Sequence, residues 1–233
     1  MLDEPKIGGF RPFSATESIY VKRKCYRRKG GTPITRTTNE KRRDLKIRKI
    51  LSAAHRVFCR KGYLAVRMQD IIDECGISRG CIYLYYASVD EVLRAVIAQR
   101  NSDRFTLISD AVQADMPFAT VLAQYLSRQR ERLLGIQNSL FRAYCEYIFS
   151  QPKEAVGALR DSQLGYLRKS VLSILMLGVA QGAIRDEKVA RLADHFIVVI
   201  DGLSVLALSD ALTTEVLDAQ FGVLQDMIKN LEV

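Results

Sequence analysis

The residues with the clearest chemical potential lie in one short segment, from Asp70 to Tyr83, which reads DIIDECGISRGCIY. Arg79 carries a forked guanidinium that matches the O6 and N7 acceptors of guanine, a contact that gives about 1–3 kcal/mol of discrimination between bases. The Tyr83 hydroxyl in the same segment can donate to a phosphate oxygen, which positions a protein on a duplex without specifying sequence. The segment therefore indicates recognition of nucleic acid.

Two short helices are needed to position these side chains. We expect a helix at about 67–75 and a second, recognition helix at 79–86, within a motif at 66–85. Gly76 stands between them, and glycine tolerates the positive φ that the turn requires. Ser78 can cap the second helix. The pattern predicts a helix-turn-helix unit, in which the N-terminal residues of the second helix face the major groove.

Over a longer stretch, the sequence resembles the TetR family of transcriptional regulators. The matching elements are Ile50-Leu51-Ser52-Ala53-Ala54, Val57-Phe58, Lys61-Gly62-Tyr63, Gln69-Asp70-Ile71, Cys75-Gly76-Ile77-Ser78-Arg79-Gly80, Ile82-Tyr83-Leu84-Tyr85-Tyr86 and Ser88-Val89-Asp90-Glu91-Val92-Leu93. The resemblance implies an all-α homodimer that binds a palindromic double-stranded DNA operator, usually as a repressor. It also implies that a small ligand in the C-terminal domain weakens DNA binding.

The resemblance assigns the DNA contacts to eight residues. They are Arg67, Gln69, Ser78, Arg79, Gly80, Cys81, Tyr83 and Tyr85. The chain departs from the family pattern at Val66-Arg67, where many members have two threonines, and at Val89, where many have a lysine. A hydroxyl and a cation that would contact phosphate are therefore missing, and Arg67 is a candidate to replace one of them.

Charge divides the chain unevenly. The formal net charge of the 233 residues is +9, and the excess of lysine and arginine lies in the first hundred residues. We interpret residues 1–37, with the run KRKCYRRK at 22–29, as a flexible basic arm, either a phosphate-binding arm or a leader without function. Residues 38–100 are then the DNA-binding domain and residues 101–233 a ligand-binding and dimerisation domain.

The second half reads as five further helices, which gives an all-α chain of about nine helices. Aromatic and basic residues in it are candidates to line a ligand pocket. They are Tyr125, Arg128, Phe141, Tyr144, Tyr147 and Tyr166. The last two predicted helices carry a wide apolar face, so we expect a homodimer through about residues 186–231.

Several classes of protein find no support in the sequence. No apolar run is long enough to span a membrane and no secretory signal is present, which favours a cytoplasmic protein. The five cysteines and two histidines lack the spacing of a metal site, so we expect no metal, no cofactor and no enzymatic activity. The G-x-S-x-G pattern at 76–80 joins two helices rather than a strand and a helix. The alternative function is a ligand-independent nucleic-acid binder that uses the basic arm for non-specific affinity.

Overall fold

The computed structural model describes residues 38–231, and the predicted basic arm at 1–37 lies outside this range. Within it the chain is all-α, as the sequence predicts, with nine α-helices and one short 3-10 helix. The elements are α1 (Thr38–Lys61), α2 (Met68–Cys75), α3 (Arg79–Tyr83), α4 (Val89–Gln113), α5 (Phe118–Leu134), η1 (Ile136–Asn138), α6 (Leu140–Ser150), α7 (Lys153–Ala180), α8 (Val189–Leu208) and α9 (Thr214–Lys229).

Side-chain caps explain where three of these helices begin. The Ser78 hydroxyl accepts from the Cys81 amide at 3.3 Å, and the Ser88 hydroxyl accepts from the Glu91 amide at 3.2 Å. Thr213 caps α9 in the same way. Each hydroxyl satisfies an amide that has no partner within its helix.

The end of the recognition helix differs from the expectation. This helix ends at Tyr83 instead of residue 86, because the chain turns through Leu84 toward the cap of α4. In the second half, the extended backbone of Ser139 separates η1 from α6.

The first core cluster joins α1, α2, α3 and α4, and it also draws on α6 and α7. Ile50, Phe58, Ile71 and Ile82 are fully buried in it. Tyr147 of α6 is buried in the same cluster, although it lies far along the chain. α4 runs without a break across residue 100, where the sequence suggests a domain boundary. The helix-turn-helix unit is therefore supported by side chains from both halves of the chain.

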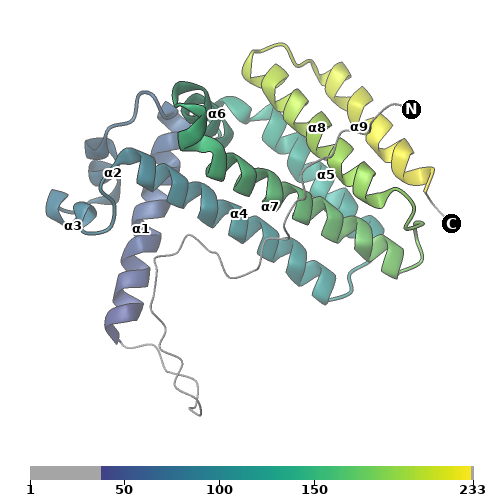
Figure 1. Ribbon diagram of the computed structural model, residues 1–233, viewed down its shortest axis with the longest axis horizontal. Coiled ribbons are helices and arrows are strands. Elements are labelled where there is room, and N and C mark those ends of the chain that lie inside the picture. Colours follow the sequence, from purple (N-terminus) through teal and green to yellow (C-terminus); the bar gives the residue numbers. More distant parts are fainter. Residues whose placement is uncertain (1–37, 232–233) are drawn as a thin grey trace, which may run out of the picture. The chain divides into compact units, whose positions relative to one another are not determined.

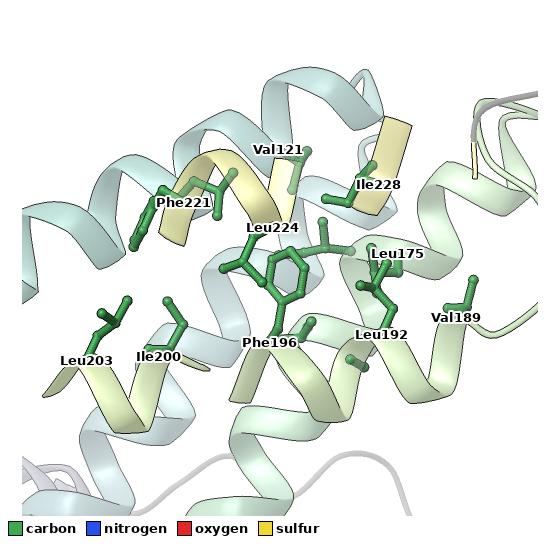
Figure 2. Close-up of a cluster of buried hydrophobic side chains, with 14 of the residues drawn as sticks. Val121, Leu175, Val189, Leu192, Phe196, Ile200, Leu203, Phe221, Leu224 and Ile228 are labelled. Carbon is green, nitrogen blue, oxygen red and sulfur yellow. The ribbon is translucent and has the colours of Figure 1, made fainter. Parts of the chain in front are cut away.

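The second core cluster is built by α5, α7, α8 and α9. Phe196 of α8 lies at its centre, near Leu175 of α7 and Leu224 of α9 (Figure 2). Gly178 of α7 permits a close helix approach, because a Cβ there would stand 2.9 Å from the Phe118 ring. Figure 1 shows α4 and α7 running between the end that carries α2 and α3 and the end that carries α8 and α9.

Candidate functional site

The turn between α2 and α3 has the geometry that its sequence predicts. Gly76 adopts φ 61° and ψ 48°, and its amide donates to the Ile72 carbonyl at 2.9 Å, which closes α2. Ile77 is half-buried against the first core, and Ile82, on the inner face of α3, is fully buried. These contacts fix the direction of α3 relative to α2, so the face of α3 opposite Ile82 is held toward solvent.

The eight predicted DNA-contact residues divide into two groups by exposure. Six are exposed around α2 and α3: Arg67, Gln69, Ser78, Arg79, Gly80 and Tyr83. Cys81 and Tyr85 are half-buried, and Tyr85 packs against the first core. The Tyr85 ring therefore has a structural role in the first core.

Arg79 is held on the outer face of α3 by a neighbour one turn away. Its guanidinium carbon lies 5.7 Å from the centroid of the Tyr83 ring, the geometry of a cation–π contact. Beside it, a Cβ added to Gly80 would meet no atom within 4 Å, so the surface there is flat and open. A flat face beside a forked cation suits close approach to base edges.

Ion pairs brace α2 against α1. Glu74 accepts from Arg56 Nε at 2.7 Å and from Arg60 Nη2 at 3.1 Å. Asp70 pairs with Lys61 Nζ at 2.6 Å and accepts from the Arg67 amide at 2.8 Å. The bonds from Lys61 and then from the Arg67 amide hold the pKa of the Asp70 carboxyl below its usual value. Because these groups are partly exposed, they orient α2 more than they stabilise the fold.

The first half of α1 carries exposed cations that are absent from the eight predicted DNA-contact residues. Its exposed side chains include Lys41, Arg42, Arg43, Lys46, Arg48 and Lys49. Lys49 and Lys46 lie near enough to Cys75 of α2 to oppose the rise that burial causes in the pKa of its thiol. The charge run at 41–49 is the sequence signal that identifies them, once α1 is known to lie beside α2.

A cavity of about 540 Å³ lies in the second half of the chain. Its lining comes from α4, α5, α6, α7 and α8, and it includes five of the six predicted ligand residues: Tyr125, Arg128, Phe141, Tyr144 and Tyr166. The volume falls in the range usual for small-molecule sites. Burial raises the pKa of Tyr125 and of Tyr144 to about 12, so both phenols are neutral hydrogen-bond donors.

Tyr147, the sixth predicted ligand residue, does not line the cavity. Its ring is fully buried in the first core and meets Tyr63 edge-on, with centroids 4.9 Å apart. Its hydroxyl oxygen accepts from Arg94 Nε at 3.0 Å. The helical spacing explains the difference, because Phe141 and Tyr144 face one side of α6 while Tyr147 and Ala143 face the other.

The neighbouring Glu146 joins α6 to the loop between α1 and α2. Its Oε2 accepts from the Tyr63 amide at 2.6 Å and from the Leu64 amide at 3.0 Å, and its Oε1 accepts from Arg142 Nε at 2.9 Å. Gly62 adopts φ 75°, and a Cβ there would stand 2.4 Å from the carboxylate. One short helix thus contacts both the cavity and the base of the helix-turn-helix unit.

Between 38 and 231, no group of three or more histidine, cysteine, aspartate or glutamate side chains is arranged to hold a metal ion. No helix in this range is long and apolar enough to cross a membrane.

Comparison with known proteins agrees with this geometry. Residues 50–96, which span most of α1, all of α2 and α3 and the start of α4, match the family model for bacterial regulatory proteins of the tetR family. An uncharacterized HTH-type transcriptional regulator, YfiR of Bacillus subtilis (strain 168), is 26% identical over 163 residues, which cover 69% of this chain and 79% of that protein.

Solved structures share the fold at lower identity. A TetR transcription regulator from Haloarcula marismortui superposes with a TM-score of 0.64 at 20% identity, covering 82% of this chain and 100% of the other. A transcriptional regulator from Saccharomonospora viridis, solved in complex with choline, gives 0.59 at 22% identity, covering 80% and 96%. These two likenesses show the fold alone. The match at residues 50–96 and the helix-turn-helix geometry identify this part of the chain as the DNA-binding domain of a TetR-family transcriptional regulator.

Proposed function

We propose that the protein is a cytoplasmic repressor that binds a palindromic operator as a homodimer and releases it when a small ligand occupies the cavity. The observation that carries the proposal is the position of α6 between the cavity and the helix-turn-helix unit. Phe141 and Tyr144 line the cavity, while Glu146 and Tyr147 contact the loop before α2.

On the DNA side, Arg79 reads a base in the major groove and Gly80 lets the helix approach. Ser78, Tyr83 and Gln69 contact phosphates or base edges beside it, with Arg67 at the head of α2 replacing the absent threonine hydroxyl. Cys81 contacts a thymine methyl group and Tyr85 a phosphate. The support is the exposure of the other six residues around the two helices and, for the half-buried Cys81 and Tyr85, the resemblance of the segment to the family.

On the ligand side, occupation of the cavity moves α6. A shift of α6 would displace Glu146, which holds the Tyr63 and Leu64 amides, and with them the start of α2. A ligand acts only through its different affinity for the two arrangements of this helix. Two recognition helices that no longer match the spacing of the half-sites then lose the operator.

The dimer is proposed to form through α8 and α9. Large apolar side chains remain exposed on both helices: Val198, Val205, Leu206, Val216 and Val223. Such surface is unusual on a monomer and typical of an interface between subunits.

The release step is testable with a fluorescent organic anion in place of the physiological ligand. An operator duplex is first selected from a random pool, and its binding by the full chain is followed by fluorescence anisotropy as 1-anilinonaphthalene-8-sulfonate is added. We expect the Kd for the duplex to rise about tenfold or more. Such a rise corresponds to a coupling free energy that is usual for allosteric proteins.

The variant Glu146→Ala supplies the control for coupling. It should bind the dye as the wild type does and keep the operator when the dye is bound. An operator affinity that stays constant in the wild type, although the dye is bound in the cavity, would rule out ligand-induced release.

A further inference from the structure

The charge of the cavity is unusual for a site with aromatic walls. Four arginines and two aspartates line it. Arg100 and Arg104 are one turn apart on α4, and Arg128 and Arg132 are one turn apart on α5, so each pair shares a face of its helix. Among the described residues of the lining, the cations outnumber the anions by two.

The four arginines have no carboxylate partner within the described part of the chain. Between residues 38 and 231, no aspartate or glutamate oxygen lies within 4.0 Å of any of them. Arg132 is nevertheless held in place, since it donates to Gln129 Oε1 and to Ser204 Oγ, each at 3.0 Å, and lies over the Phe141 ring. The other three make no hydrogen bond to a described residue.

This arrangement opposes folding. Burial, and then the neighbouring Arg100, lower the pKa of the Arg104 guanidinium, and burial followed by Arg104 lowers that of Arg132. After burial, the same Arg100 and Arg104 are the main charges that lower the pKa of His55 to about 4. Like charges one turn apart destabilise a helix, so the stability of the fold gives no reason to collect four of them around a hollow. A residue pattern that violates a local rule is expected at a functional site.

The two aspartates offset only part of this charge. Asp110 is exposed, as are Arg104 and Arg128, and burial raises the pKa of the half-buried Asp201 while Arg132 opposes the rise. The rest of the lining is largely apolar or aromatic, and the rings of Tyr125, Phe141 and Tyr144 provide much of it. The cavity therefore combines an excess of positive charge with a surface for an apolar group.

We propose that the ligand of this cavity is an organic anion with an aromatic or aliphatic body, whose acidic group is bound by the arginines of α4 and α5. This inference rests on the proposed function, in which the cavity is the effector site. Guanidinium groups bind carboxylates and similar acids through two parallel hydrogen bonds, and they do so best in a partly desolvated site. A cation such as choline, which the Saccharomonospora protein binds, would be repelled here.

A matched pair of dyes tests the charge directly. 1-Anilinonaphthalene-8-sulfonate and N-phenyl-1-naphthylamine share the same aromatic body and differ in one anionic group, and both fluoresce when they leave water. For the full chain we expect the anion to bind about tenfold more tightly or better, as one charge-assisted interaction provides. The double variant Arg100→Gln, Arg104→Gln should lower the affinity for the anion by a similar factor and leave the neutral dye within about twofold.

The control removes two arginines outside the cavity. Arg130 and Arg168 form exposed ion pairs with Asp218 and Asp194, so Arg130→Gln, Arg168→Gln changes the net charge equally and should leave both dyes unaffected. Folding of the test variant is checked by its urea midpoint, which should equal or exceed that of the wild type because repulsion is removed. Arg128→Gln provides a second, single-site variant with the same expected direction.

Three outcomes would overturn the inference: equal affinity for the two dyes, an anion affinity that the Arg100 and Arg104 changes leave intact, or no binding of either dye. The proposed function is tested separately, by measuring the binding of the operator duplex by fluorescence anisotropy. If the anion binds through the arginines and the operator stays bound, the ligand class stands and the release step fails. If both dyes bind equally and release the operator, the release step stands and the anion preference fails.

Discussion

Replacement of Glu146 gives the sharpest test of how α6 is joined to the helix-turn-helix unit. The carboxylate accepts from the Tyr63 amide at 2.6 Å and the Leu64 amide at 3.0 Å. Hydrogen bonds to a charged group contribute about 1.5–3 kcal/mol each when they are well buried. Since the Glu146 side chain is 21% exposed and Leu64 is exposed, we expect Glu146→Ala to cost about 2 kcal/mol in all.

The cost should appear first as local opening of the loop between α1 and α2. A loss of about 2 kcal/mol corresponds to roughly thirtyfold faster exchange of the Tyr63 and Leu64 amide hydrogens. Glu146→Gln retains a neutral acceptor, and because charge-assisted bonds are about twice as strong as neutral ones, it should lose about half as much. Amide exchange of the full chain, resolved to these residues, measures both effects.

A matched control is Glu131→Ala on α5, where the exposed carboxylate accepts from Ser127 Oγ at 3.3 Å and from no other residue between 38 and 231. It should leave the exchange of both loop amides unchanged. If the Tyr63 and Leu64 amides of Glu146→Ala exchange as slowly as in the wild type, the carboxylate does not hold the loop. The proposed coupling of the cavity to α2 through α6 is then wrong.

Three further predictions concern other parts of the chain. Gly80→Ala should raise stability by up to about 1 kcal/mol, because alanine favours a helix. It should also weaken operator binding in an anisotropy titration, because the methyl group stands on the face that approaches DNA. Unchanged binding would place that face away from the duplex. Burial lowers the pKa of His55 to about 4, so between pH 6.5 and 4 the unfolded chain binds a proton at this residue and the folded chain does not. Stability therefore falls as the pH drops through this window. The fall in urea midpoint from pH 7 to pH 5 should be smaller in His55→Gln, and an equal fall would show that His55 does not cause it. Val205→Glu introduces a charge into the exposed apolar face of α8 and should halve the mass found by analytical ultracentrifugation, whereas an unaltered dimer would move the interface elsewhere.

Local patterns made the helices and the turn predictable. Gly76 must have positive φ between two apolar-periodic segments, and Ser78 and Ser88 each stand where a helix needs a cap. Such signals involve neighbours within a few residues, so they can be read without knowing the fold. The end of the recognition helix was not predictable in this way, because the turn at Leu84 depends on where α4 must start.

Long-range packing decides the rest of the site, and the sequence does not encode it locally. Tyr144 and Tyr147 are three residues apart and of the same type, yet one lines the cavity and the other is buried beneath the helix-turn-helix unit. No sequence signal reveals the contact of Glu146 with the loop, because Tyr63 and Leu64 lie more than eighty residues earlier. Arg100 and Arg104 are recognisable as a pair only when α5 supplies the other two arginines.

We propose that α3 reads a palindromic operator through Arg79. Selection of duplexes from a random pool by the full chain, followed by sequencing, tests this proposal. We expect two inverted half-sites to be enriched, and Arg79→Ala to lose the preference at one position of each half-site, by the roughly 1–3 kcal/mol of a bidentate contact with guanine. A pool that remains random, or a preference that Arg79→Ala leaves intact, would contradict the account.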